Sequence, residues 1–303
     1  MSKASIGFIG VGLMGHGMAK NLLEKGWKVT VLGHRNRAPV DDLVGRGASE
    51  AKDIAGLMAV SDIVFVCVTG TPQVEDLVHR ADGLLATCRP GQIIVDTSTC
   101  QPGSTRRMAE AFRAKSVRFV DSPLTRTPVE AEQGRLNTLT GADPDTFREI
   151  EPVLRGFCEN VFHVGDVGAG HTLKLVNNFL SIGSVAVFAE ALAACVKLGL
   201  DPKELVKLVS VGPLNSAMFQ MAAGGAVEGD FTRMKFALAN AAKDVRYFIG
   251  EMTEAKFAGV VSSAVNQSLN QALALGFGEP DKLLASLIEA QAKLNNVTIP
   301  PSR

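Results

Sequence analysis

The chain of 303 residues is long enough for about two domains of ordinary size. Hydrophobic residues make up 46% of the sequence and charged residues 20%, a composition that excludes a disordered or fibrous chain. The 31 Lys and Arg residues balance the 31 Asp and Glu residues, so no net positive charge attracts nucleic acid or an anionic membrane surface. We therefore expect a globular protein that binds no nucleic acid.

The cysteines, the histidines and the N-terminus indicate the redox compartment, the metal content and the targeting of the protein. The five cysteines are odd in number and form no C-x-x-C pair, which is typical of thiols in a reducing cytosol. The five histidines are scattered, with no H-E-x-x-H motif, so we expect no metal. Residues 1–3 lead almost directly into an apolar strand and leave no room for a signal peptide. We expect a cytoplasmic protein.

The first half of the chain alternates short apolar runs with helix-length segments, the pattern of βαβ units around a parallel sheet. The predicted strands are Ser5–Ile9, Lys28–Leu32, Ile63–Val68, Gln92–Asp96, Arg118–Asp121 and Arg135–Thr140. The predicted helices are Met14–Lys25, Pro39–Gly45, Gln73–Leu77, Thr105–Lys115 and Pro144–Leu154. After Gly165 the strand-like runs end, and helical segments rich in Ala, Leu and Val continue to about Leu294. We expect an α/β domain over residues 1–165 and an all-α domain over residues 166–303 for substrate binding or dimerisation.

The most apolar helical segment runs from Leu173 to Leu200. Glu190 and Lys197 interrupt it, so the sequence favours a helix of a soluble protein over a membrane span, and we expect no membrane partner. The segment is apolar on nearly every face and therefore needs cover from neighbouring helices or from another subunit. We expect a homodimer or homotetramer.

Three glycines follow the first predicted strand and open the first predicted helix. Gly10, Gly12 and Gly15 form the pattern G-x-G-x-x-G, in which the first glycine permits a tight turn and the third permits close helix packing. The second glycine lets the backbone approach a pyrophosphate, which the helix N-terminus stabilises. This context predicts a Rossmann-type dinucleotide-binding domain.

The end of the second predicted strand carries basic residues instead of a carboxylate. Folds that prefer NAD place an Asp or Glu there to bind the ribose 2′-hydroxyl, whereas this chain has His34, Arg35, Asn36 and Arg37. Arginine presents paired donors to phosphate oxygens. The loop therefore favours NADP, with NAD still possible, while a merely solvated basic loop would leave the preference open.

Five motifs in this order resemble the β-hydroxyacid dehydrogenase family, which includes 3-hydroxyisobutyrate and 6-phosphogluconate dehydrogenases and glyoxylate/succinic semialdehyde reductases. The resemblance covers nearly the whole chain. The motifs are Gly10 to Gly15, Asp96-Thr97-Ser98-Thr99, Asp121-Ser122-Pro123 with Gly134, Gly168-x-Gly170-x-x-x-Lys174-x-x-x-Asn178, and Lys243-Asp244. The resemblance implies an NAD(P)-dependent oxidoreductase that transfers hydride between a small β-hydroxyacid and its semialdehyde or keto acid, in the cleft between the two domains.

The resemblance assigns Lys174 as the general acid/base. The residues support this role, because a lysine in the first turns of a helix, partly buried and near the positive end of the dipole, has a lowered pKa and exchanges protons near neutral pH. Asn177 and Asn178 follow on the same helical face, and Asn178 matches the family position better. A lysine extending to solvent beside two solvated amides is the structural alternative.

The remaining site residues are also implied by the resemblance. The cofactor contacts would be Gly10, Gly12, Leu13, Met14, Gly15, His34, Arg35, Asn36, Arg37, Val68, Thr69, Thr71, Thr99 and Lys243. The substrate contacts would be Ser98, Ser122, Thr125, Arg126, Thr127, Lys174 and Asn178. Ser98 and Thr99 have a structural alternative as caps of the turn before Pro102, and Lys243 as the partner of a carboxylate.

One segment departs from the family pattern. The family usually has Ser-Gly-Gly where this chain has Thr125-Arg126-Thr127. Arg126 removes a close backbone approach but adds a guanidinium that would suit a second carboxylate or a larger acidic substrate. Alternatively, Arg126 points outward and only the shape of the loop changes.

Two other functions use the same fold. Imine reductases resemble the two-domain plan but generally carry another residue at the position of Lys174. A non-catalytic NADP-binding module would lack the lysine or carry a fused reader domain. The presence of Lys174 favours the hydroxyacid dehydrogenase, whereas the carbon skeleton, the stereochemistry and the physiological direction are not encoded in these motifs.

Overall fold

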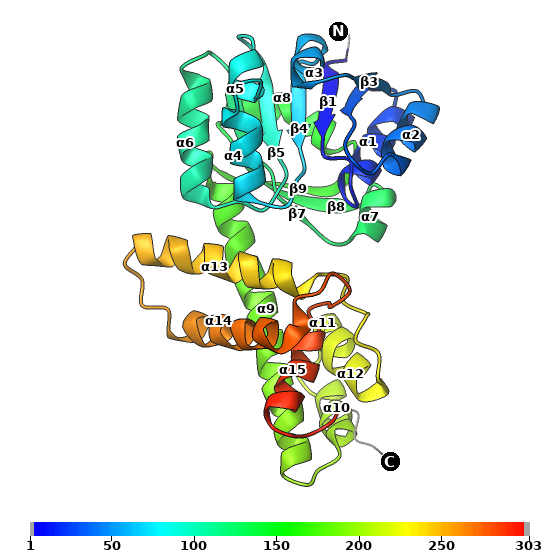
Figure 1. Cartoon of the computed structure of the whole chain (residues 1–303), viewed down its shortest axis with the longest axis vertical. Helices are drawn as coiled ribbons and strands as arrows, with labels where there is room; N and C mark the ends of the chain where they lie inside the picture. The colour runs from blue at the N-terminus through cyan, green and yellow to red at the C-terminus, as the bar shows by residue number, and fades with distance from the viewer. Residues whose placement is uncertain (1–2, 300–303) are drawn as a thin grey trace. The chain divides into compact units, whose positions relative to one another are not determined.

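The computed structural model describes residues 3–299, so the outermost ends of the two predicted domains lie outside the described residues. The chain divides into two compact units, residues 1–174 and residues 175–303. The first unit is a sheet with helices and the second is helical (Figure 1). The predicted α/β and all-α fold classes are confirmed.

The first unit is built on one nine-stranded sheet among the described residues. The strands are β1 Ser5–Ile9, β2 Lys28–Leu32, β3 Ser49–Ala51, β4 Ile63–Val66, β5 Ile93–Asp96, β6 Arg118–Asp121, β7 Leu124–Thr125, β8 Leu136–Gly141 and β9 Cys158–Gly165. Their order is β3-β2-β1-β4-β5-β6-β8-β7, with β9 beside β8. The first six strands pair in parallel, while β8 is antiparallel to β6 and β7. The order 3-2-1-4-5-6 is that of the Rossmann fold.

Helices cover both faces of this sheet. They are α1 Gly15–Glu24, α2 Ala38–Gly45, α3 Ile54–Val60, α4 Thr71–His79, α5 Leu84–Thr87, α6 Pro102–Arg113, α7 Pro128–Glu132 and α8 Pro144–Leu154. Alternate residues of the strands supply the two cores, since Phe65 packs with α1, α2 and α8, whereas Val64 packs with α3 to α6. This alternation follows from the two-residue period of a strand buried on both faces.

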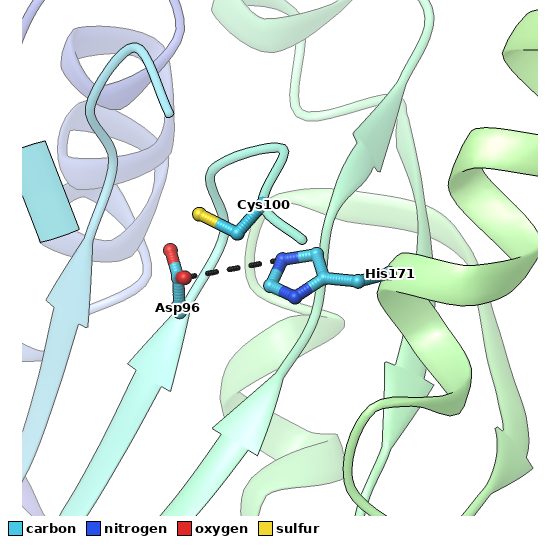
Figure 2. A group of neighbouring side chains, drawn as sticks. All are labelled: Asp96, Cys100 and His171. Carbon is cyan, nitrogen blue, oxygen red and sulfur yellow. Dashed lines mark ion pairs between the residues drawn. The ribbon is translucent and has the colours of Figure 1, made fainter. Parts of the chain in front are cut away.

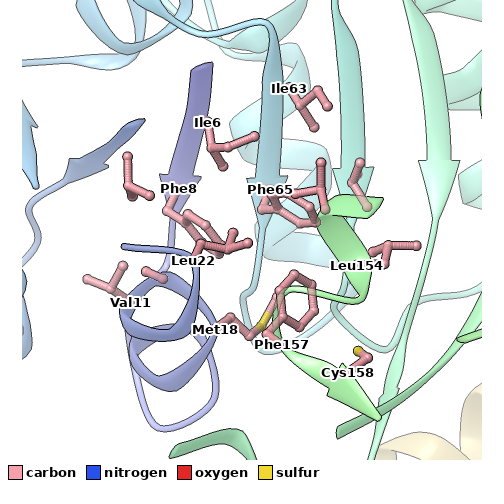
Figure 3. Packing of buried hydrophobic residues seen from close by; sticks show 14 of the residues in the cluster. Ile6, Phe8, Val11, Met18, Leu22, Ile63, Phe65, Leu154, Phe157 and Cys158 are labelled. Carbon is pink, nitrogen blue, oxygen red and sulfur yellow. The ribbon is translucent and has the colours of Figure 1, made fainter. Parts of the chain in front are cut away.

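Aromatic residues form the centre of one of these cores. The rings of Phe8 and Phe65 stack with their centroids 5.1 Å apart, and Phe157 meets Phe65 edge-on at 5.6 Å (Figure 3). Each of these rings is fully buried, which contributes about 1.5–3 kcal/mol per side chain to folding. The core fixes β1 and β4, the two strands whose carboxyl ends frame the Gly10 loop.

The second unit is helical throughout its described elements. They are α9 Ala169–Lys197, which begins in the first unit, then α10 Pro202–Ser210, α11 Ala217–Phe219, the π-helix η1 Gln220–Gly224, α12 Gly225–Glu228, α13 Leu238–Glu254, α14 Val260–Ala272, the π-helix η2 Leu273–Phe277 and α15 Ser286–Leu294. Their core includes Ile182, Leu192, Leu238 and Leu269, all fully buried. By contrast, Leu180 and Val187 of α9 are 64% and 62% exposed.

By length and composition alone, α9 would be able to span a membrane. Its most apolar window of 18 residues has a mean hydropathy of 2.0, and 33% of that window is buried. The charged residues Glu190 and Lys197 therefore distinguish α9 from a membrane-spanning helix less clearly than the sequence suggested. One such helix is weak evidence, because core and interface helices have the same composition. The expectation of no membrane partner remains a prediction.

Candidate active site

The glycine-rich loop between β1 and α1 has the geometry that a pyrophosphate site needs. Gly10 has φ +94°, and a Cβ atom there would lie 2.1 Å from the carbonyl oxygen of Cys67. A Cβ atom at Gly15 would lie 2.0 Å from the carbonyl oxygen of Gly10. At Gly12 no atom comes within 4 Å of the Cβ position. The first and third glycines are thus required by the loop itself, while the backbone at Gly12 is open to a ligand.

A surface hollow of about 680 Å³ lies where β2 and β3 end. It is lined by Gly33, His34, Arg35, Arg37, Glu50, Ala51 and Lys52. Four of these side chains are basic or can become so, which fits an anion such as a ribose phosphate. Sequence reasoning missed Lys52 and Glu50, because the short edge strand that brings them beside the β2 loop was not predicted.

Two of the predicted cofactor residues on the β2 loop, Asn36 and Arg37, already have partners, and Arg37 also lines the hollow. Arg37 donates from Nη1 to Oε1 of Glu50 at 2.5 Å and from Nη2 to Oδ1 of Asp41 at 2.8 Å. The Arg37 guanidinium holds the pKa of Glu50 below its usual range. The side-chain oxygen of Asn36 accepts a hydrogen bond from the N–H of Ala38 at 3.3 Å. His34 and Arg35 are exposed.

Hydrogen bonds connect the loops after β4 and β5 to one another. Ser98 is buried, and its Oγ accepts a hydrogen bond from the N–H of Val68 at 3.0 Å. Thr71 is also buried, and its Oγ1 accepts from the N–H of Gln101 at 2.9 Å. These hydroxyls therefore shape the two loops. Thr69 is exposed and Thr99 half-buried, so these side chains are more accessible to a cofactor.

Asp96, Cys100 and His171 meet in the interior of the first unit (Figure 2). Their potential ligand atoms lie within 4.8 Å of one another, and these residue types bind transition metals in other proteins. However, Nε2 of His171 lies 3.1 Å from the carbonyl oxygen of Ser98. A carbonyl oxygen only accepts, so Nε2 carries the hydrogen and offers no lone pair to a metal. We interpret the His171 ring as held by Ser98 and Thr105 instead of by a metal, and the expectation of no metal remains a prediction.

Asp121 at the end of β6 holds the start of α9. Its Oδ1 accepts from the N–H of Gly168 at 2.6 Å and its Oδ2 from the N–H of His171 at 2.7 Å. Burial raises the pKa of the Asp121 carboxyl above its ordinary value, while His171 and the two backbone donors act in the opposite direction. The sequence motif included Asp121, but nothing in the sequence indicated that it binds the first turn of the helix that carries Lys174.

Lys174 and Asn178 both belong to α9, four residues apart. Lys174 is half-buried. Within the second unit, Asn178 is buried and its Nδ2 donates to Oδ2 of Asp244 at 2.6 Å. Nζ of Lys243 lies 3.2 Å from Oδ1 of the same carboxylate, which itself is only 3% exposed. Lys243 thus does pair with a carboxylate, but with a buried one.

The predicted substrate segment mostly makes contacts within the protein. Ser122 is fully buried, with its Oγ 2.6 Å and 2.9 Å from the hydroxyls of Thr138 and Thr140. Thr127 caps α7 and forms a capping box with Glu130. The geometry of Ser122 and Thr127 gives no support to a substrate contact. The side-chain oxygen of Thr125 accepts from Nδ2 of Asn137 at 3.2 Å.

Arg126 has φ +79°, in the left-handed region that favours glycine. The position thus keeps a conformation suited to the glycine usual in the family. Nη1 of Arg126 donates to the carbonyl oxygen of Arg135 and to the carboxylate of Glu159. These contacts favour the interpretation that Arg126 shapes the loop, and its role in substrate binding stays a prediction.

The strand order and the glycine-rich loop together define a Rossmann-type dinucleotide-binding protein with a second, helical unit. A family model for the NAD-binding domain of 6-phosphogluconate dehydrogenase matches residues 5–165. A second model, for the NAD-binding region of NADP-dependent 3-hydroxyisobutyrate dehydrogenase, matches residues 168–287. The chain belongs to the β-hydroxyacid dehydrogenase family of NAD(P)-dependent enzymes, as the sequence motifs implied.

Individual relatives agree with this placement. The chain is 33% identical over 296 residues to 2-(hydroxymethyl)glutarate dehydrogenase of Eubacterium barkeri, covering 97% of each chain. It is also similar to the solved structure of Psf3 in complex with NADP+ and 2-OPP, at 26% identity and a TM-score of 0.80 over 94% of this chain and 99% of that one. An imine reductase from Myxococcus stipitatus in complex with NAD+ shares the fold at 22% identity and a TM-score of 0.63 over 95% of this chain and 99% of that one.

Proposed function

We propose that this enzyme interconverts a small β-hydroxyacid and its semialdehyde or keto acid with NADP(H), using Lys174 as the general acid/base. The observation that carries the proposal is the attachment of the α9 start, three residues before Lys174, to the ends of β5 and β6. His171 binds the loop after β5 and Asp121 at the end of β6. The lysine therefore belongs to the same folded unit as the glycine-rich loop.

Each direction of the reaction requires a different protonation state of Lys174. The bound nicotinamide supplies the hydride acceptor in oxidation and the hydride donor in reduction. In oxidation, the neutral Lys174 amine takes the proton of the substrate hydroxyl. In reduction, the Lys174 ammonium returns that proton to the developing alkoxide. Asn178, whose amide is oriented by Asp244, would hydrogen-bond the same substrate oxygen.

The preference for NADP is supported by the basic hollow after β2 and by the lack of a carboxylate on the β2 loop itself. The substrate class is supported by the relative that is named for a hydroxymethyl dicarboxylate. A small carboxylate with one or two acid groups is therefore the proposed substrate.

The exposed apolar residues of α9 support a homodimer or homotetramer. Leu180 and Val187 are seven residues apart and thus lie on one face of the helix. A face of this kind is typical of helices that pack against another helix. Light scattering on the purified protein tests the oligomer, and fractionation of cells tests the proposed cytoplasmic location.

A substrate panel assayed in both directions tests the proposed function. The panel contains short hydroxyacids and aldehyde acids with one or two carboxylates, together with cyclic imines, each with NADP(H) and NAD(H). We expect turnover of a hydroxyacid or aldehyde acid with NADP(H). Turnover of imines alone would instead support the imine reductase, and cofactor binding without turnover would support the non-catalytic module.

A further inference from the structure

His171 joins three segments of the first unit through its own atoms. Its side chain is completely buried. Nε2 lies 3.1 Å from the carbonyl oxygen of Ser98 in the loop after β5, and Nδ1 lies 2.8 Å from Oγ1 of Thr105 on α6. Its backbone N–H donates to Oδ2 of Asp121 at the end of β6. One residue therefore fastens the start of α9 to two strand ends and to one helix.

The chemistry of these partners fixes the orientation of the imidazole ring. Since the carbonyl oxygen of Ser98 only accepts, Nε2 is the donor of that bond, and Nδ1 faces the Thr105 hydroxyl. Two buried carboxylates flank the ring, with Oδ2 of Asp96 3.9 Å from Nε2 and Oδ2 of Asp121 3.8 Å from Nδ1. Rotating the ring would break a bond in a site closed to water, which costs about 1–3 kcal/mol for each buried group left unpaired.

The surrounding backbone leaves little room for the helix start to move. A Cβ atom at Gly170 would lie 2.3 Å from the carbonyl oxygen of Leu139, and one at Gly141 would lie 2.5 Å from Oδ1 of Asp121. The first turn of α9 is thus packed directly against β8 and the end of β6. Because close-packed contacts leave no free space, a displacement of β8 or of the end of β6 would also displace the first turn of α9.

The segments that His171 joins carry the groups of the proposed chemistry. Lys174 follows His171 by three residues, nearly one turn along α9. Ser98, whose carbonyl oxygen accepts from His171, precedes Thr99, which is expected beside the nicotinamide. We propose that His171 is a positioning residue that holds the Lys174 turn of α9 in register with the Ser98–Thr99 loop. This inference rests on the proposed function of Lys174.

Three substitutions separate the two side-chain bonds of His171. The amide nitrogen of glutamine reaches the position of Nε2, so His171→Gln keeps the donor to Ser98. The amide of asparagine reaches only the position of Nδ1, so His171→Asn keeps the contact with Thr105 and loses the bond to Ser98. His171→Phe keeps a ring and loses both. His163→Phe is the matched control, because His163 also bonds a backbone carbonyl, that of Ala142, but lies on exposed β9.

Kinetics and amide hydrogen exchange are measured on each variant. We expect His171→Asn and His171→Phe to lower kcat by about 10- to 100-fold through displacement of the acid/base, while KM and the Kd for NADPH change by about twofold or less. Exchange should become faster in peptides covering residues 97–101 and 168–174. His171→Gln should restore most of kcat and most of the protection, and His163→Phe should match the wild type.

The outcomes distinguish this inference from the proposed function. Wild-type turnover that survives Lys174→Ala would refute the proposed function. Lysine-dependent turnover that is equal in all three His171 variants, or that falls only in proportion to Tm, would overturn the positioning role alone. If the panel contains no substrate, amide hydrogen exchange tests the positioning role. Unchanged protection of residues 97–101 in His171→Asn would contradict the inference.

Discussion

The guanidinium of Arg37 donates two hydrogen bonds to the carboxylate of Glu50. Nη1 lies 2.5 Å from Oε1, and Nη2 lies 3.0 Å from Oε2. Asp41 binds the same group at 2.8 Å. Two carboxylates therefore offset the charge of Arg37. The hollow also contains Arg35 and Lys52, which are left to provide the net positive charge for a 2′-phosphate.

Cofactor selectivity should consequently depend on Arg35 and Lys52. We expect Arg35→Ala and Lys52→Met each to raise the Kd for NADPH about tenfold and to leave the Kd for NADH nearly unchanged, because only NADPH carries the extra phosphate. Glu50→Gln should lower the Kd for NADPH about fivefold by removing a nearby negative charge. Cofactor fluorescence titrations at two salt concentrations measure these values. Equal effects on both cofactors would contradict the assignment of the hollow.

The pair of Asn178 and Asp244 should stabilise the second unit. Asp244→Ala leaves the Asn178 amide buried without its acceptor, so we expect a loss of about 2 kcal/mol in unfolding free energy. Asp244→Asn keeps an acceptor oxygen at that place and should lose less. Urea unfolding followed by circular dichroism measures the difference, with exposed Asp281→Ala as the control in the same unit. Equal stability of the two Asp244 variants would show that the bond to Asn178 does not matter.

Arg126 allows the two interpretations of the substrate loop to be separated. Arg126→Gly removes the strain of a positive φ, about 1 kcal/mol, and also removes a surface ion pair of about 0–1 kcal/mol, so stability should change little. Because Glu159 engages the guanidinium, we expect KM for mono- and dicarboxylate substrates to change by about twofold or less. An increase in KM of about tenfold for the dicarboxylate alone would show that Arg126 binds the second carboxylate.

The N-terminal cap of α8 should contribute a pH-dependent stability. Asp143 accepts hydrogen bonds from the N–H groups of Asp145 and Thr146, and bonds to Thr146 hold the pKa of Asp143 below its ordinary value of 3.8. A lowered carboxyl pKa stabilises the fold above the unfolded value, and this contribution is lost as the pH falls through the folded value.

Asp143→Ala should therefore cost about 1 kcal/mol at pH 7 and progressively less as the pH falls below 3.8 and the wild-type cap becomes protonated. Asp143→Asn retains an uncharged cap and should lack this pH dependence. The urea concentrations at the midpoint of unfolding, measured across the pH range, test the predictions for the two variants. A cost of Asp143→Ala that grows toward low pH would have the wrong sign.

Strands and helices with a strong local pattern were predictable. Helix α8 was predicted with its observed bounds, because Asp143 caps it and Pro144 opens it. Strands β1, β2 and β6 were also predicted as observed. The missed elements are the short β3, α3, α5, β7 and α7 and the strand β9. Strand β9 exposes much of both faces, and its sequence therefore lacks the apolar run of a buried strand.

The candidate site was predictable only as far as its motifs extend. Gly10 and Gly15 are required by backbone contacts that any such loop makes, so the motif was sufficient. Glu50, Asp244 and His171 act through partners 13, 66 and 73 residues away in sequence, a distance over which local patterns carry no information. Ser122 was predicted as a substrate contact, but its position in a motif could not reveal that its hydroxyl faces Thr138 in the interior.

The most direct test of the central claim is the kcat/KM of Lys174→Ala on the best substrate of the panel, with and without added methylamine, beside the Kd for NADPH. We predict a loss of about 10²- to 10⁴-fold with NADPH binding nearly unchanged, because the variant lacks only the proton donor and acceptor. Methylamine should restore part of the activity in proportion to its concentration. A Lys174→Ala enzyme that keeps wild-type kcat/KM would contradict the account.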